Sequence, residues 1–379
     1  MSEERIPVLI VAGEASGDLH AAKLVKEMNA AGNFAFFGSA GEKMRAEGVE
    51  PTVHADGLSI VGLLEIGQAL PMFWSVYKKL IAEAERREAK LAILVDFPDF
   101  NMKLAKALKK RGLTVVYYIS PQLWAWRKYR IKTIRNYVDL VISILPFEKD
   151  WYAKNGVDHV EYVGNPLATE VHSSVSKDQF CRKHLLDPTR PIISLLPGSR
   201  TSEISRILPE LIKTAIAMQS ERQDLQFIGA LPKGKLAKIG KLDWPRSAWL
   251  HWVEGETYDA LNASDAAAIT SGTATLEAGI IGTPMAIVYK TSAINYKLLR
   301  PLIDVEHFGL INLIAGKRVA AELIQDDFTP ESLSAELFRM LEPSINTSVR
   351  GELAAAVDKL GHGGASKRAA DAILGLIEE

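Results

Sequence analysis

The sequence has a single cysteine, no long apolar run and almost no excess charge, and each shortage excludes a class of protein. The one thiol, Cys181, cannot form an internal disulfide, and no group of Cys and His has zinc-ligand spacing. No run of about 18 apolar residues occurs, so no membrane-spanning helix is predicted. With 45 Lys and Arg against 46 Asp and Glu, nothing favours non-specific nucleic-acid binding. The apolar stretch at residues 6–12 is too short for a secretory signal, which predicts a cytoplasmic protein.

The composition is that of a folded protein, and the length is that of a protein with two domains. Hydrophobic residues make up 47% and charged residues 24% of the 379 positions, as in ordinary globular proteins. At roughly 100–200 residues per domain, this length predicts two domains with their own cores.

Short apolar segments alternate with helical segments, which predicts parallel sheets with helices on both faces, an α/β fold. The predicted strands are residues 6–12, 91–96, 114–119, 139–144, 191–196, 225–230, 265–269 and 284–289. A polar stretch interrupts this alternation once, and the end of the chain is helical throughout. We predict doubly wound domains at residues 1–168 and 191–329, a linker at 169–190 and a helical tail at 330–379. Ligands of such sheets bind at the carboxyl ends of the strands, so the loops facing a cleft between the domains are expected to carry function.

Three loops contain groups that bind anions. Residues 13–18 (GEASGD) and 270–277 (TSGTATLE) follow predicted strands and open helices, whose first amides favour an anion. Residues 196–200 (LPGSR) add a hydroxyl and a guanidinium, which suit phosphate oxygens. The alternatives are capped helix starts and a surface ion pair between Arg200 and Glu203. The glycine patterns of dinucleotide-binding and P-loop proteins are absent, so NAD binding and ATP hydrolysis are not supported.

Two carboxylates, Asp96 and Asp99, follow the strand at residues 91–96. A carboxylate at a strand end is a candidate for the general base that takes a proton from an attacking hydroxyl. The alternative assigns Asp99 or Asn101 to helix capping and Asp96 to a structural hydrogen bond.

Aromatic and apolar side chains are concentrated in two segments. Residues 120–127 (SPQLWAWR) place two Trp and one Arg after a strand, to contact sugar faces, acyl chains or a phosphate, or to pack beneath a loop. Residues 57–81 contain more apolar side chains than one helix face buries. The alternatives for this segment are a core, a partner, lipid chains or a bilayer surface.

Several ungapped segments, in one order along the chain, resemble the lipid A disaccharide synthases. The matching segments are residues 12–20, 96–101, 118–121, 124–127, 196–200, 271–278, 284–285 and 312–316. The resemblance implies the GT-B fold, with two Rossmann-like domains, and an inverting glycosyltransferase that needs no metal or other cofactor. It implies transfer of 2,3-diacylglucosamine from UDP-2,3-diacylglucosamine to 2,3-diacylglucosamine 1-phosphate, giving lipid A disaccharide 1-phosphate and UDP. It also implies work at the inner surface of the cytoplasmic membrane and a homodimer that exchanges C-terminal segments.

The resemblance and the loop chemistry together assign roles to individual residues. The expected catalytic residues are Asp96, as general base on the acceptor 6-hydroxyl, and Asp99. UDP is expected to contact Ser199, Arg200, Ser271, Gly272, Thr273 and, through its ribose, Glu277. The acceptor is expected to contact Gly13, Glu14, Ser16, Gly17, Asp18, Ser120, Trp126, Arg127 and Asn165. Lipid is expected to lie against residues 57–81, including Leu63, Leu64, Phe73 and Trp74. No metal ligand is predicted.

The chain departs from the family pattern at two motifs. Residues 164–166 read Gly-Asn-Pro where the family commonly has Gly-His-Pro, and residues 38–41 (GSAG) replace a Gly-x-Gly-Gly motif. Asn165 keeps the capacity to form hydrogen bonds but cannot titrate near neutral pH. Beyond residue 325 the match to the family is weak.

Two other functions are weighed against this one. A UDP-sugar 2-epimerase of the same architecture needs no lipid acceptor, so it does not explain residues 57–81. A nucleotide-binding protein without catalytic activity would not need paired carboxylates facing the anion loops.

Overall fold

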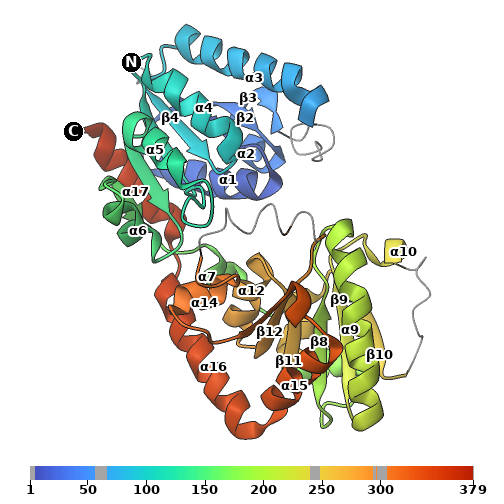
Figure 1. Cartoon of the computed structure of the whole chain (residues 1–379). Helices are drawn as coiled ribbons and strands as arrows, with labels where there is room; N and C mark the ends of the chain where they lie inside the picture. The colour runs from blue at the N-terminus through green and yellow to red at the C-terminus, as the bar shows by residue number, and fades with distance from the viewer. Residues whose placement is uncertain (1–4, 56–65, 240–247, 293–295, 297–304, 379) are drawn as a thin grey trace. The chain divides into compact units, whose positions relative to one another are not determined.

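The computed structural model describes residues 5–55, 66–239, 248–292, 296 and 305–378. The chain forms two compact units (Figure 1), and each contains one parallel sheet. The first unit combines Met1–Pro166 with Gly363–Glu379, and the second is Leu167–His362. Among the described helices, none combines the length and the hydropathy that crossing a membrane requires.

The first unit contains a seven-stranded sheet in the order β3-β2-β1-β4-β5-β6-β7. Its strands are β1 (Ile6–Val11), β2 (Phe34–Ala40), β3 (Glu50–His54), β4 (Leu91–Val95), β5 (Thr114–Tyr118), β6 (Leu140–Ser143) and β7 (Val160–Tyr162). Its helices are α1 (Ala15–Ala31), α2 (Glu42–Ala46), α3 (Ile66–Arg86), α4 (Pro98–Lys109), α5 (Ile131–Tyr137), α6 (Glu148–Lys154) and α17 (Ala365–Glu378). Successive side chains of a strand point to opposite faces, so Val8 packs with α1 and α17 whereas Leu9 packs with α3 and α4.

The second unit contains a six-stranded sheet in the order β10-β9-β8-β11-β12-β13. Its strands are β8 (Ile192–Leu196), β9 (Gln226–Leu231), β10 (Leu250–Glu254), β11 (Ala266–Thr270), β12 (Met285–Tyr289) and β13 (Ala321–Ile324). Its helices are α7 (Leu167–Glu170), α8 (Lys177–His184), α9 (Thr201–Glu221), α10 (Leu236–Ile239), α11 (Thr257–Ala263), α12 (Thr273–Ile281), α14 (Leu310–Ala315), α15 (Pro330–Leu341) and α16 (Pro343–Val357). Helices α9 and α15 share a core with β8, β11 and β12, and α12 packs against α14 and α16.

The eight strands predicted from the sequence are all present, and the structure adds β2, β3, β7, β10 and β13. Four of these five, β3, β7, β10 and β13, lie at the sheet edges. Edge strands are partly exposed, so they lack the continuous apolar run by which a buried parallel strand is found in a sequence.

The units differ from the predicted domains at two places. The predicted linker, residues 169–190, contains α8 and belongs to the second unit, where Phe180 and Cys181 are buried and Ser174 donates to the Asp259 carboxylate. The predicted helical tail divides, because α15 and α16 belong to the second unit whereas α17 packs against α1 of the first. The apolar face of α17 accounts for this return, since Ile373 is fully buried there.

Candidate active site

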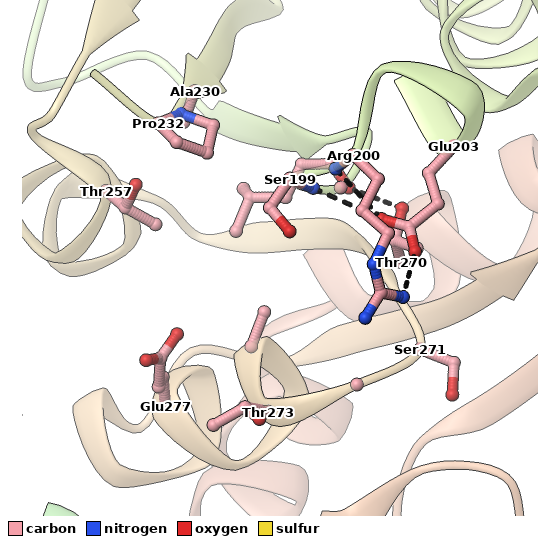
Figure 2. Close-up of a pocket in the computed structure, with 14 residues that line it drawn as sticks. Ser199, Arg200, Glu203, Ala230, Pro232, Thr257, Thr270, Ser271, Thr273 and Glu277 are labelled. Atoms are coloured by element: carbon pink, nitrogen blue, oxygen red, sulfur yellow. Dashed lines mark hydrogen bonds and ion pairs between the residues drawn. The ribbon is translucent and has the colours of Figure 1, made fainter. Parts of the chain in front are cut away.

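A cavity of about 390 Å³ lies where strands of the second unit end (Figure 2). Strands β8 and β11 are neighbours in the sheet, so the loops at residues 197–200 and 271–272 emerge at the same edge. Figure 2 shows Ser199 and Arg200 on one side of the cavity and Thr273 and Glu277 on the other. The structure therefore brings the predicted UDP contacts of the second unit together around one space.

The amino end of α12 lines this cavity without a side-chain cap. Gly272, which precedes the helix, has a φ of 151°, a conformation that other residues rarely adopt. Its carbonyl accepts a hydrogen bond from the Thr275 hydroxyl at 2.9 Å, which fixes the turn. The first amides and the dipole of α12 therefore favour an anion in the cavity.

Ser271 has a structural role that the sequence did not reveal. Its hydroxyl donates to the Phe308 carbonyl at 2.8 Å, and its amide donates to the Val288 carbonyl at 2.9 Å. Both donors of Ser271 are therefore used within the protein. Ser271 thus holds the loop before α14 and also lines the cavity, and its contact with UDP stays a prediction.

Arg200 forms the ion pair with Glu203 that the sequence left as an alternative. Its guanidinium donates to Glu203 at 2.9 Å, and the Ser199 and Arg200 amides donate to the same carboxylate at 3.3 and 3.2 Å. The Glu203 carboxylate thus accepts hydrogen bonds from the donors that would bind an anion in the cavity. The Arg200 side chain is 80% exposed, and an exposed pair contributes little free energy, so a diphosphate can compete with Glu203 for these donors.

Glu277 lies between this cavity and a second one of about 370 Å³. Burial raises the pKa of Glu277, and a hydrogen bond from the Tyr258 hydroxyl, 3.0 Å from Oε1, opposes that rise. The second cavity is also lined by His172, Gly255 and Tyr258. Glu277 therefore offers an acceptor for hydroxyl groups to both cavities.

Asp96 follows β4 of the first unit and has a left-handed backbone conformation. The φ angles of Asp96 and Phe97 are 48° and 50°, values that non-glycine residues hold only where the surroundings impose them. The Asp96 carbonyl accepts bonds from the Tyr117 hydroxyl at 2.7 Å and from Asn101 Nδ2 at 2.8 Å. Tyr117 was assigned no role from the sequence and Asn101 only the alternative role of a helix cap, because both act through the Asp96 backbone.

The Asp96 side chain lies beside the loop at residues 13–18. A Cβ on Gly13 would lie 2.4 Å from the Phe97 ring, so only glycine permits this approach. Burial, and then the negative charge of Glu14, raise the pKa of Asp96 to about 6, while the Phe97 amide opposes them. A carboxylate with this pKa is suited to accept a proton near neutral pH.

Asp99 is in the opposite electrostatic situation. Partial burial raises its pKa, but hydrogen bonds and charges from Arg130 and Arg127 outweigh that effect and hold the pKa below its ordinary value. Arg127 Nη1 lies 2.8 Å from Asp99 Oδ1, and Arg130 donates to the same oxygen. We therefore revise the role of Asp99 from candidate base to ion-pair partner.

Two further predicted acceptor contacts have structural roles. The buried Asp18 carboxylate accepts bonds from the amides of Gly41, Lys43 and Met44 at 2.8–3.2 Å and so caps α2. The buried Ser120 hydroxyl lies 2.8 Å from the Tyr152 hydroxyl. The other predicted acceptor residues are distributed between surface and interior: Glu14, Ser16 and Trp126 are exposed, Arg127 is partly exposed, and Gly13, Gly17 and Asn165 are buried.

Glu148 supports the loop at residues 120–127 from below, a role that sequence reasoning missed. Its buried carboxylate accepts a bond from Trp124 Nε1 at 3.0 Å. Burial raises the pKa of Glu148 to about 8, against the bonds from Trp124, from backbone amides and from Ser120. Trp124 therefore packs beneath the loop, whereas Trp126 remains 39% exposed.

Helix α3 contains the described part of the predicted lipid segment; Leu63 and Leu64 lie outside the described residues. Phe73 packs against the core between the sheet and α3, as the core alternative expects. Leu70 and Trp74 are 59% and 58% exposed, and Lys78 lies over the Trp74 ring at 5.4 Å. The helix therefore has one buried apolar face and one exposed apolar stripe.

In the described residues, no group of three or more His, Cys, Asp or Glu is arranged to hold a metal ion.

A model of the lipid-A-disaccharide synthetase family matches residues 8–373. The chain belongs to this family. A lipid-A-disaccharide synthase from Syntrophus aciditrophicus is 42% identical over 381 residues, covering 98% of both chains, and one from Trichlorobacter lovleyi is 40% identical with the same coverage. The predictions of this family and of an enzyme, made from the motifs, are confirmed. The family match also extends well beyond residue 325, where the motifs alone were weak.

Solved structures at low identity share the architecture of this family member. The calicheamicin glycosyltransferase CalG4 has a TM-score of 0.61 at 12% identity, covering 99% of both chains. A UDP-N-acetylglucosamine 2-epimerase has a TM-score of 0.59 at 13% identity, covering 99% of this chain and 97% of its own. Likeness at such identity shows the fold alone, and it confirms the predicted GT-B fold. The whole-length relatives near 40% identity therefore favour the synthase over the epimerase alternative.

Proposed function

We propose that this chain joins two acylated glucosamine units during lipid A synthesis. It transfers 2,3-diacylglucosamine from UDP-2,3-diacylglucosamine to the 6-hydroxyl of 2,3-diacylglucosamine 1-phosphate. The products are the β-1,6-linked disaccharide 1-phosphate and UDP. The observation that carries the proposal is the family match across nearly the whole chain.

The first unit binds the acceptor, and Asp96 is the general base. Its carboxylate accepts the proton of the 6-hydroxyl while the hydroxyl oxygen bonds to C1 of the donor sugar and the bond from C1 to UDP breaks, which inverts C1. Support comes from the pKa of about 6 and from the constrained backbone of Asp96.

The second unit binds UDP. The diphosphate lies at the amino end of α12, against Gly272, Thr273 and Arg200, and displaces Glu203 from the Arg200 guanidinium. The ribose hydroxyls donate to Glu277, and the second cavity holds the uracil. Arg200 and the α12 dipole stabilise the charge of departing UDP, so we expect turnover to need no metal. Unchanged activity in EDTA is the expected result. A loss of activity in EDTA that a divalent cation restores would contradict it.

The exposed stripe on α3 supports binding to the inner surface of the cytoplasmic membrane. Leu70, Trp74 and Lys78 recur every four residues along the helix, an apolar and basic stripe of the kind that lies in a bilayer interface. The acyl chains of both substrates place them in that interface.

No nucleic-acid partner is expected. The homodimer rests on the family resemblance, and light scattering in detergent tests it.

A mass-spectrometric assay tests the reaction. Purified protein is incubated in detergent with UDP-2,3-diacylglucosamine and the acylated acceptor phosphate, and in parallel with UDP-GlcNAc alone. Disaccharide 1-phosphate formed only from the acylated donor is the expected result. Conversion of UDP-GlcNAc to its 2-epimer without disaccharide would transfer the assignment to an epimerase.

A further inference from the structure

Two arginines that follow β5 converge on one exposed carboxylate. Arg127 and Arg130 both donate to Oδ1 of Asp99, the first at 2.8 Å. The Asp99 side chain is 69% exposed, whereas that of Arg130 is only 19% exposed. The carboxylate is therefore the solvent-facing and replaceable member of the cluster, while Arg130 is held by its surroundings.

The Arg127 guanidinium is held in place independently of Asp99. It lies 4.0 Å from the centre of the Trp126 ring, a cation–π contact that keeps the guanidinium plane in position. Arg127 also has a φ of 56°, a left-handed conformation that is uncommon for a non-glycine residue. Both guanidinium groups are thus oriented before any ligand arrives.

The charge of this cluster matches a phosphate better than a carboxylate. One Asp99 carboxylate balances only one of the two guanidinium groups. A phosphate monoester carries up to two negative charges and three terminal oxygens, and each guanidinium can bind two oxygens at once. A sugar phosphate can therefore satisfy both arginines, which Asp99 alone cannot.

The two arginines and the general base lie on the same side of the sheet, where the carboxyl ends of the strands are. Strands β4 and β5 are neighbours in the sheet, Asp96 and Asp99 follow β4, and the two arginines follow β5. We propose that Arg127 and Arg130 form the subsite for the anomeric phosphate of the acceptor, and that this phosphate replaces Asp99 as the anion paired with both arginines. The inference rests on the proposed function, because it assigns the acceptor phosphate to one end of a sugar whose 6-hydroxyl meets Asp96.

The test compares acceptors with and without the 1-phosphate at saturating UDP-2,3-diacylglucosamine, in wild type, Arg127→Gln and Arg130→Gln. We expect kcat/KM for the phosphorylated acceptor to fall about tenfold to hundredfold in each variant, as for loss of charged hydrogen bonds. We expect kcat/KM for 2,3-diacylglucosamine without phosphate to stay within about twofold of wild type. Arg111→Gln is the matched control, because Arg111 forms an exposed ion pair with Glu85. Arg111 precedes β5 and therefore lies on the side of the sheet where the strands begin.

Hydrogen exchange of the β4 and β5 amides, in the first unit that contains both arginines, reports that each variant is folded. Equal losses on both acceptors would assign the arginines a structural role, and no loss on either would place the phosphate elsewhere; both outcomes overturn the subsite. If wild type makes no disaccharide from either acceptor, the proposed function itself fails, and the subsite fails with it.

Discussion

At the residue scale, the pKa values of two aspartates three positions apart are shifted in opposite directions by their surroundings. Burial and Glu14 raise the pKa of Asp96 to about 6, whereas two arginines lower that of Asp99. The folded state therefore binds the Asp96 proton more tightly than the unfolded chain, in which the pKa is near 3.8. The stability from this residue is fully present below pH 3.8 and is lost as the pH rises through 6. Asp96 thus costs stability at the pH where it acts as a base.

Asp96→Asn is expected to lower turnover by about 10²–10⁴-fold, because Asn cannot accept the proton of the 6-hydroxyl. The Kd for UDP is expected to stay nearly unchanged, and the unfolding temperature to stay equal or rise, since a buried charge is removed. Disaccharide formation, UDP titration and thermal unfolding measure these three effects. Unchanged turnover would remove Asp96 from the mechanism.

Wild-type kcat/KM is expected to fall as the pH drops through about 6, where Asp96 gains its proton. Glu14→Gln is expected to move this acidic limb to lower pH, because loss of the Glu14 charge lowers the pKa of Asp96. The pH profile of kcat/KM is the measurement. Glu88→Gln, an exposed position before the opposite end of β4, is the control and leaves the limb in place. A limb that stays fixed in Glu14→Gln would contradict the pairing of Glu14 with Asp96.

At the element scale, the conformation of one glycine determines what α12 can bind. Gly272 before the helix and Gly282 after it have φ angles of 151° and 84°, and a Cβ at either would meet nothing within 4 Å. Substitution at either position therefore strains the backbone rather than creating a clash. Only the Gly272 end lines the cavity that is proposed to hold the diphosphate.

Gly272→Ala is expected to weaken UDP binding about tenfold or more, because the strained turn no longer directs the first amides of α12 at the diphosphate. Isothermal titration with UDP is the measurement. Gly282→Ala is the matched control, in which a similar strain lowers stability but leaves the Kd for UDP unchanged. Equal losses of affinity in both variants would indicate general destabilisation of α12 instead.

At the scale of the whole molecule, the end of the chain completes the core at its beginning. Ile373 on α17 is buried with β1 and α1, and Arg368 donates to the carbonyl of Val163, 205 residues earlier in the chain. The stability of the first unit therefore depends on residues that follow the whole of the second unit.

Ile373→Ala is expected to destabilise the first unit by about 2–5 kcal/mol, as for a large-to-small change in a core. Ile216→Ala on α9, where the side chain is 45% exposed, is the matched control and is expected to change stability by about 0.5 kcal/mol or less. Hydrogen exchange of the β1 and α1 amides is the measurement. Exchange unaffected by Ile373→Ala would show that α17 is dispensable to this core.

The sequence by itself determined the interior strands other than β2, the loops that follow them and the family. These features are local: a buried strand is an apolar run, and the anion loops are short patterns of glycine, hydroxyl and charge. Only the tertiary structure decided which polar side chains are left for ligands. Asp18 is used by amides 23 to 26 residues away, Ser271 by Phe308, and Asp99 by Arg127 and Arg130. Burial and hydrogen-bond partners fix the pKa and the role of a side chain, and both come from segments that meet only when the chain folds.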